Sequence, residues 1–309
     1  MTDRTHAETS VGLPKPALTS RARALFNRSE PLRGYSLMSP TLLVMFVALV
    51  LPVLMLITFS FWTQNYLDID RSLTFDNYIK FFDKPIYTKL LWKSIRIAAL
   101  VTFVTVILAY PAAYFIAFRV KKNKMVWLIL ITVPFWTSYL LRVFAWKVIL
   151  GYNGVINSGL MSLGILAEPL QFLLYNPTAV IITLAHAWAA FAILPLYVSL
   201  EKIDRSLLEA AADLGEGPFM QWVRVTLPLS LPGIIGASLL VFIPTVGDYI
   251  TPNLVGGPKG ILIGNVIQSL FGRANNWPLG ATTAIMSMIY IAILVSVFLW
   301  VSKRYRANA

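Results

Sequence analysis

Residues 39–62 read SPTLLVMFVALVLPVLMLITFSFW and contain no acidic or basic side chain. The hydrocarbon core of a bilayer is about 30 Å thick, so a helix crosses it with roughly 20 apolar residues. The stretch is also longer than the apolar core of a cleavable secretory signal, which has about 7–15 residues. We therefore expect a retained membrane-spanning helix over 39–62.

Five more stretches have a similar length and a similar excess of apolar residues, namely 94–118, 125–149, 178–200, 229–252 and 280–302. In lipid, backbone N–H and C=O groups must be hydrogen-bonded within the protein, which restricts spanning segments to helices or to closed barrels of shorter, alternating strands. These runs are long and continuous. The sequence therefore predicts an all-α polytopic membrane protein with six transmembrane helices.

The composition excludes several classes of function. Of the 309 residues, 57% are hydrophobic and 13% are charged, whereas soluble domains carry roughly 25% charged residues. The chain has no cysteine and only two histidines, His6 and His186. It therefore offers no disulfide or thiolate metal site and little material for an imidazole-based active site. We expect no catalytic residue and no metal ligand.

The basic residues flank the apolar runs. The net charge is +12, but Lys and Arg gather where membrane anchors do, not in the stripe with stacking aromatics that binds nucleic acid, so we expect no nucleic-acid partner. The loop between the second and third spans is strongly basic, and residues 150–177 contain no Lys or Arg. In total, 16 basic residues lie on the side of that loop and seven on the other. The positive-inside bias then places both termini in the cytoplasm.

This orientation divides the chain into four parts. Residues 1–36 form a cytoplasmic N-terminal tail, 37–93 the first transmembrane helix and an external segment, 94–302 a core with the other five helices, and 303–309 a cytoplasmic C-terminal tail. The external segment is rich in aromatic residues, and we expect it to lie at the outer surface.

A polar stretch over 204–228, DRSLLEAAADLGEGPFMQWVRVTLP, interrupts the core on the predicted cytoplasmic side. Ser206 followed by Glu209 fits a capping box at the start of a helix, with Asp204 as the alternative N-cap. Gly215 permits a turn, and a second helix then leads to Pro228. We expect a short helix–turn–helix on the surface, with one apolar face made by Leu207, Leu208, Ala211 and Leu214.

The spacing within this stretch resembles a known pattern. Glu209-Ala210-Ala211, three residues, Gly215, nine residues and Val225-Thr226-Leu227-Pro228 match the EAA loop of binding-protein-dependent ABC importer permeases, with Val225 where the family has isoleucine. The resemblance implies the type I (MetI-like) permease fold in a bacterial inner membrane.

In that family the loop is a coupling helix that docks on a separate ATPase subunit. The resemblance therefore assigns a coupling role to the matching positions: Glu209, Ala210, Ala211, Gly215, Leu227 and Pro228. The small alanines allow close approach, and the carboxylate supplies a charge. The alternative is that Glu209 only completes its own cap and Gly215 only ends a helix.

The resemblance also implies partners and excludes a nucleotide site in this chain. The partners are an ATPase dimer, a second permease subunit (a different chain or another copy) and a periplasmic substrate-binding protein, all around a chain embedded in the bilayer. The chain has no G-x-x-x-x-G-K-[ST] loop to cradle phosphates. We therefore expect no cofactor here and no enzymatic activity, with ATP and Mg bound by the ATPase.

A narrower resemblance concerns the substrate. Residues 135–150, 242–267 and 276–282 are similar to the spermidine/putrescine permeases, which implies polyamine import. Importers of ferric iron, thiamine, phosphonate or other small organic solutes share parts of these stretches and stay as alternatives. An ion-coupled secondary transporter is disfavoured because no acidic residue lies at a predicted span centre, and a membrane enzyme is disfavoured by the missing catalytic groups.

Four residues are candidates for the substrate pathway. Pro244, Gly247 and Pro252 loosen the outer end of the fifth span, and a carboxylate beside an aromatic face there would attract a cation. The candidates are Asp248, Tyr249, Trp136 and Tyr139. The alternatives are that Asp248 pairs with Arg142 or Lys147 or caps the next helix, and that the aromatic residues only pack.

Overall fold

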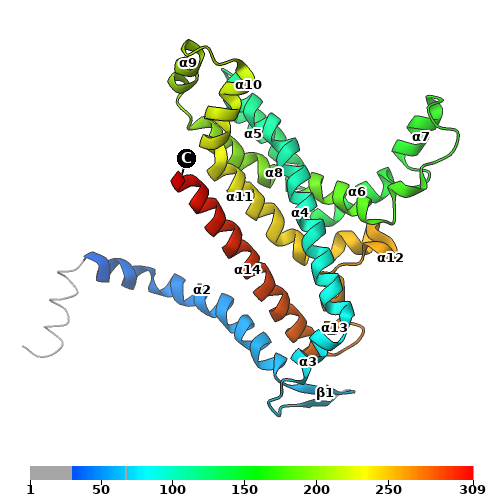
Figure 1. Cartoon of the computed structure of the whole chain (residues 1–309). Helices are drawn as coiled ribbons and strands as arrows, with labels where there is room; N and C mark the ends of the chain where they lie inside the picture. The colour runs from blue at the N-terminus through cyan, green and yellow to red at the C-terminus, as the bar shows by residue number, and fades with distance from the viewer. Residues whose placement is uncertain (1–29, 67, 309) are drawn as a thin grey trace, which may run out of the picture. The chain divides into compact units, whose positions relative to one another are not determined.

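The computed structural model describes residues 30–66 and 68–308 (Figure 1). Residues 1–29 of the predicted N-terminal tail lie outside the described residues, whereas residues 30–36 already belong to a helix. The chain forms two compact units, Met1–Met55 and Leu56–Ala309, and each is described by itself.

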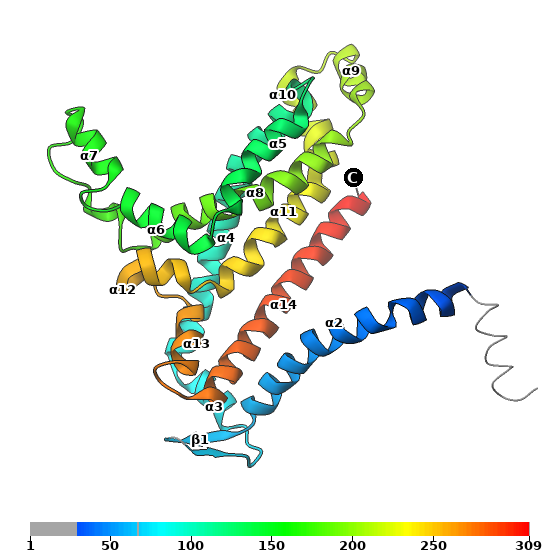
Figure 2. The ribbon, with the colours of Figure 1, turned by 180° about the vertical axis from the view of Figure 1, so that it is seen from behind.

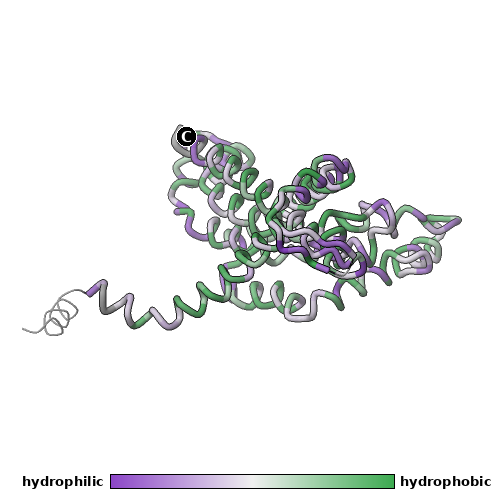
Figure 3. The backbone as a smooth tube through the Cα atoms, turned by 90° about the horizontal axis from the view of Figure 1, so that it is seen from below, coloured by the Kyte–Doolittle hydropathy of each residue, from purple (hydrophilic) through white to green (hydrophobic). Residues whose placement is uncertain are grey.

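The first unit contains most of helix α2, Glu30–Ser60. The helix begins nine residues before the predicted start at 39 and ends close to the predicted end. None of its most apolar 18-residue window is buried, and Figure 3 shows the hydrophobic residues that follow one another along it. A helix that is apolar on all sides suits a lipid or protein environment and not water.

The second unit is almost entirely helical. It begins with the end of α2 and a small antiparallel hairpin, β1 (Thr63–Asn65) and β2 (Asp68–Asp70), in which Thr63 pairs with Asp70. The remaining elements are α3 (Asp76–Asp83), α4 (Pro85–Tyr114), the π-helical turn η1 (Phe115–Arg119), α5 (Lys124–Thr132), the 3₁₀ turn η2 (Val133–Trp136), α6 (Tyr139–Ile149), α7 (Val155–Ser162), the 3₁₀ turn η3 (Gln171–Leu173), α8 (Pro177–Glu201), α9 (Arg205–Asp213), α10 (Pro218–Gln221), the π-helical turn η4 (Trp222–Thr226), α11 (Leu227–Gly247), the π-helical turn η5 (Pro252–Gly256), α12 (Gly257–Gly260), α13 (Ile263–Phe271) and α14 (Trp277–Asn308).

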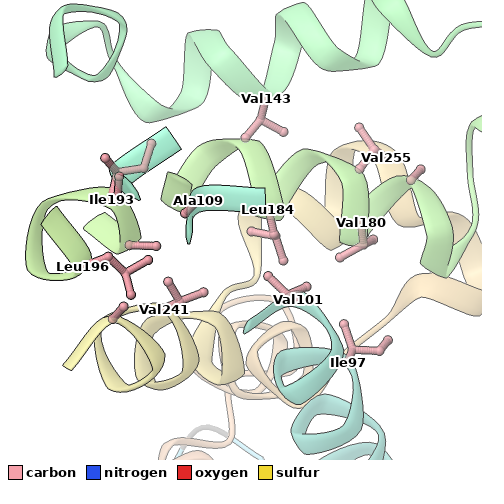
Figure 4. Packing of buried hydrophobic residues seen from close by; sticks show 14 of the residues in the cluster. Ile97, Val101, Ala109, Val143, Val180, Leu184, Ile193, Leu196, Val241 and Val255 are labelled. Carbon is pink, nitrogen blue, oxygen red and sulfur yellow. The ribbon is translucent and has the colours of Figure 1, made fainter. Parts of the chain in front are cut away.

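Three long helices, α4, α8 and α11, pack around the main hydrophobic cluster (Figure 4). Val101 of α4, Leu184 and Leu196 of α8 and Val241 of α11 are fully buried in it. Between them lie small residues, which let helix backbones approach closely in a membrane; those that are buried include Ala109, Ala113, Ala192 and Ala237.

A second cluster lies at the other end of this unit, where α3, α4, α13 and α14 meet. Phe81, Leu91 and Ile263 are almost completely buried there. The cluster lies at the end of the unit away from α9 and α10, while the C-terminal end of α14 lies on the α9 side (Figures 1 and 2). The helices of the unit therefore have one end marked by α9 and one marked by the β1–β2 hairpin.

Five helices in the described part of the chain are long and apolar enough to cross a membrane, and a bent pair makes a sixth. The pair replaces the predicted third span, 125–149. Lys124–Trp136 and Tyr139–Ile149 meet at an angle of 85°. Pro134 lies in the 3₁₀ turn before the bend, Thr137 is extended, and Ser138 is not helical. The expectation of one unbroken helix over 125–149 was wrong because a proline weakens the helix and two non-helical residues then end it.

The bounds of the second and fifth spans also differ from the predictions. The second span begins at Pro85 and not at 94, because Pro85 starts a helix that continues without a break to Arg119. The fifth helix, α11, ends at Gly247 and not at 252, because Asp248 adopts an extended backbone. The fourth and sixth spans, Pro177–Glu201 and Trp277–Arg304, agree with the predictions within about three residues at each end.

Gly233 tests the packing of α11 on α8. A Cβ atom added at this glycine would lie 2.4 Å from Ser199 Cβ and 2.7 Å from the Pro195 carbonyl oxygen. We expect Gly233→Ala to destabilise the protein by about 1–3 kcal/mol, because overpacking forces the two backbones apart. The measurement is the thermal unfolding midpoint of the purified protein in detergent.

Gly236→Ala, one turn later on α11, is the matched control. Its added Cβ would meet Pro195 Cβ at 3.8 Å, an ordinary contact. Equal unfolding midpoints for the two variants would show that α11 and α8 do not touch at Gly233.

Candidate functional site

The N-cap of helix α9 is Asp204, one of the two residues that the sequence offered for this position. Asp204 has extended backbone angles, and its Oδ1 accepts a hydrogen bond from the Ser206 backbone N–H at 3.0 Å. This bond holds the pKa of Asp204 below its ordinary value. The predicted capping box is wrong because Ser206 already lies inside the helix, where its side chain cannot act as the cap.

Glu209 has no side-chain hydrogen bond or ion pair within the part of the chain that the structure describes. It lies on an exposed side of α9, as does Ala210, whereas Ala211 is buried. The alternative that Glu209 completes its own cap is therefore wrong. Its carboxylate is available to another molecule.

Helix α9 ends in a Schellman turn at Gly215. The Gly215 N–H donates to the Ala212 carbonyl at 2.9 Å, and the Glu216 N–H donates to the Ala211 carbonyl at 3.0 Å. Gly215 has φ of +85°, and an added Cβ would meet nothing within 4 Å. The glycine is therefore required by its backbone angle and not by lack of space.

Leu207, Ala210 and Leu214 recur at a spacing of three and four residues, so they share one face of α9. The face is open: Leu207 is 46% exposed and Leu214 85%. The predicted apolar face divides in two, because Ala211 points inward while Leu207 and Leu214 point outward. We call Leu207, Ala210 and Leu214 the α9 stripe.

The second half of the loop continues directly into α11. Pro218–Gly247 forms one continuous helical span through the π-helical turn η4, so the second helix of the loop continues past Pro228 into α11. The π-helical turn widens the backbone just before Pro228, whose ring would otherwise meet the carbonyl of the residue four positions earlier. Leu227 and Pro228 are half-buried at the start of α11.

The turn between α9 and α10 is fastened to η4. Arg224 Nη1 forms an ion pair with Glu216, and Gln221 Nε2 donates to the Glu216 backbone carbonyl at 2.8 Å. The loop is thus a short helix held on the end of a long one, with the α9 stripe and Glu209 facing outward.

Two of the four predicted pathway residues meet at the bend of the third span. Tyr139 OH donates to Asp248 Oδ2 at 2.8 Å and lies 2.6 Å from Thr251 Oγ1. Asp248 Oδ1 accepts from the Ile250 N–H at 3.0 Å, so the alternative that it caps the next helical turn is correct. Neither ion pair in the described residues involves Asp248, so its predicted pairing with Arg142 or Lys147 is not formed.

Tyr249 and Trp136 lie near these residues in sequence but make no side-chain bond with them in the described part of the chain. Tyr249 is 42% exposed and Trp136 79% exposed. Arg142 places its guanidinium carbon 4.8 Å above the Phe135 ring and 5.9 Å from the Tyr139 ring centre. The bend therefore combines one buried carboxylate with exposed and stacked aromatic rings.

Asn265 of α13 is a site residue that sequence reasoning missed. Its Nδ2 donates to the Tyr249 carbonyl at 2.9 Å and to Asn253 Oδ1 at 2.8 Å, while its Oδ1 accepts from the Leu262 N–H. It fixes the irregular segment after Asp248. The sequence feature that could have identified Asn265 is its position as the one side-chain amide in the apolar run ILIGNVI, residues 261–267.

The site contains no grouping for metal chemistry in the described residues: no three His, Cys, Asp or Glu side chains lie close enough to hold a metal ion.

The Schellman turn requires a left-handed backbone angle at Gly215, and a substitution can test this requirement. We expect Gly215→Ala to weaken the two turn hydrogen bonds by about 1–2 kcal/mol, because an L-residue is disfavoured in the left-handed region. The amides of residues 215 and 216 should then exchange with deuterium roughly 5–30 times faster.

Gly217→Ala is the matched control, because Gly217 has φ of −70° and also has open space around it. Equal acceleration in both variants would contradict the role given to the left-handed angle.

Comparison with known proteins adds independent findings. The family described as the binding-protein-dependent transport system inner membrane component matches residues 98–306. The spermidine/putrescine transport system permease protein PotB of Escherichia coli is 39% identical over 263 residues, which cover 85% of this chain and 94% of that protein. PotB of Haemophilus influenzae is 38% identical, covering 86% of this chain and 90% of that protein.

The fold is also found among solved structures. The bacterial alginate ABC transporter, solved in complex with an alginate pentasaccharide-bound periplasmic protein, contains a chain that matches with a TM-score of 0.73 and 17% identity. The match covers 93% of this chain and 98% of that chain. This likeness concerns the fold alone, and it confirms the predicted type I permease architecture.

Proposed function

Because this chain belongs to the family of inner membrane components of binding-protein-dependent transport systems, we propose that it is a permease subunit of an ATP-driven importer of polyamines such as spermidine and putrescine. The observation that carries the substrate is the 38–39% identity, over most of both chains, to permeases named for these two compounds. Family membership makes the chain a multi-pass membrane transport subunit.

The proposed coupling element is the loop with α9. Glu209 has no partner side chain in the described residues, and the α9 stripe is exposed at the end of the long helices. A separate ATPase dimer that binds this surface would transmit its closure to α8 and α11, which flank the loop. The absence of a phosphate-binding loop in the sequence supports ATP and Mg binding by that partner.

The proposed orientation puts α9 and both chain termini in the cytoplasm. The loop between α4 and α5, which carries Lys121 and Lys122, lies at the α9 end of the second unit, as does the end of α14 with Lys303 and Arg304 (Figure 2). Basic residues are enriched on the cytoplasmic side of membrane proteins. The opposite end would then receive a periplasmic substrate-binding protein, and a second permease subunit would complete the pathway.

The bend between α5 and α6 is the proposed contact for the cation. A carboxylate and aromatic faces both attract ammonium groups, and Asp248, Tyr139, Tyr249 and Trp136 supply them. Asp248 is only 9% exposed, so a change that frees it from Tyr139 would make it available to the substrate.

Uptake in cells tests the substrate. A strain without its own polyamine importers, supplied with this chain and its neighbouring transport genes, should take up labelled spermidine. Excess putrescine should compete, whereas thiamine, ferric iron and phosphonate should not. Uptake that responds only to one of the latter compounds would overturn the polyamine proposal.

Substitution in the α9 stripe tests coupling. We expect Ala210→Phe to reduce ATP-dependent uptake by about tenfold or more, because a larger side chain at a packed interface costs about 1–3 kcal/mol. Ala212→Phe is the matched control, since Ala212 is also exposed but lies roughly 200° around the helix from Ala210. The amount of each variant in the membrane is measured in parallel. Equal uptake by the two variants would contradict docking through the stripe.

A further inference from the structure

A lysine joins three helices next to the coupling loop. Lys124 Nζ, at the first residue of α5, lies 2.7 Å from each carboxylate oxygen of Glu201, the last residue of α8. The same nitrogen donates to the Ala117 carbonyl in η1 at 2.9 Å. One ammonium group therefore connects the ends of α4 and α8 to the start of α5.

The charges of Lys124 and Glu201 are favourable together at these helix ends. The last carbonyls of a helix have no partner within the helix, and a cation near them is favourable whereas a carboxylate is not. Ala117 lies in η1, the π-helical turn that ends the span begun by α4, and Glu201 is an acidic residue at the end of α8. Lys124 donates a hydrogen bond to the Ala117 carbonyl and neutralises the charge of the Glu201 carboxylate.

The joint is directly connected to α9. Only residues 202–204 separate Glu201 from Arg205, the first residue of α9, and Ile203 among them is buried. Such a short, anchored connection leaves little slack. The connection thus gives α9 a direct mechanical link to the end of α8 and, through Lys124, to η1.

The other end of the loop is also tied to α4. Tyr110 OH of α4 is hydrogen-bonded to Ser230 Oγ of α11 at 2.9 Å. The Tyr110 ring lies edge-on to Trp222 in η4, with centroids 6.0 Å apart. Both chain segments that flank α9 and α10 thus converge on the same end of one helix.

We propose that the Lys124–Glu201 joint is a positioning element that transmits movement of the coupling loop to α4, and so links ATP hydrolysis to rearrangement of the spans. This inference rests on the proposed function of the loop. The ion pair is partly exposed, with 22% and 39% of the two side chains accessible, and such pairs contribute little to folding stability. Its loss should therefore affect coupling more than the fold.

The test uses the complete importer, with its ATPase and binding protein, reconstituted in liposomes. Lys124→Ala, Glu201→Ala and the double variant are compared with Lys124→Arg, which keeps the charge. Lys122→Ala is the control, because it removes the same charge two positions before Lys124 and Lys122 is exposed without a side-chain bond in the described residues. Spermidine uptake, ATP hydrolysis and the thermal unfolding midpoint are measured for each.

We expect Lys124→Ala and Glu201→Ala each to lower the amount of spermidine imported per ATP hydrolysed by about fivefold or more, the lower bound of typical coupling between sites. The double variant should lose no more than either single variant, because the two residues act as a unit. Lys124→Arg should keep most of the ratio, and Lys122→Ala and all unfolding midpoints should be unchanged.

The outcomes separate the joint from the proposed function. A wild-type complex that hydrolyses ATP without importing spermidine removes the polyamine proposal, and the ratio for whichever solute it imports then tests the joint. If Lys124→Ala imports as much solute per ATP hydrolysed as the wild type, the proposed role of the Lys124–Glu201 joint is wrong. Losses that add in the double variant, or a fall in uptake and ATP hydrolysis together with the unfolding midpoint, also overturn it, because they show independent or purely structural roles.

Discussion

Hydrogen bonding of the backbone inside the membrane is the constraint on which this structure depends. Lipid offers no partner to a free N–H or C=O group, so the backbone groups freed at a helix break must be bonded elsewhere in the protein or by water in a cavity. After Asp248 the chain is irregular, and the Asn265 side chain bonds both the Tyr249 carbonyl and the Leu262 N–H. Lys93 donates to the carbonyls of Lys259 and Ile261 in the same segment. Specific side-chain hydrogen bonds therefore stabilise the irregular segment after Asp248.

The same constraint explains the buried hydroxyl groups of the long helices. Thr102 and Thr105 of α4 and Thr245 of α11 each donate to the carbonyl four residues earlier, at 2.6–2.7 Å. A hydroxyl that is satisfied within its own helix costs little when it is buried and leaves the helix free to pack. Polar side chains that instead bond between helices, such as Tyr110, Tyr139 and Lys124, fix the relative positions of the helices that they join.

The sequence predicts the long helices well because hydrophobic length is a strong signal over about 20 residues. It also identifies Gly215, since the Schellman turn needs a residue that tolerates a left-handed angle. It fails at the third span, where a single Pro134 among apolar residues does not reveal an 85° bend. It fails again at the N-cap, because Asp204 and Ser206 are equally good caps and only the helix register decides between them.

Contacts between residues far apart in the chain could not be predicted from the sequence. Tyr139 and Asp248 are 109 positions apart, and Lys124 and Glu201 are 77 apart. Their pairing depends on how α4, α8 and α11 pack, which is determined by many small buried residues and by Gly233, and no local pattern records it. Asp248 could be named as a functional candidate because a carboxylate is rare in an apolar run, but its partner could not.

Exposure has a different meaning in different parts of the second unit. Apolar side chains on α14 are exposed along its length, with only 6% of its most apolar window buried, and lipid can cover them at no cost. Leu214 and Phe219, at 85% and 71% exposed, lie close in sequence to the charged residues Asp213 and Glu216 between α9 and α10. Charged residues are costly in the hydrocarbon core, so lipid is a poor cover for this surface, and water would leave the apolar side chains uncovered. A protein surface that presents apolar area and a basic group to Glu209 meets both requirements, which is the chemistry expected of the proposed ATPase partner.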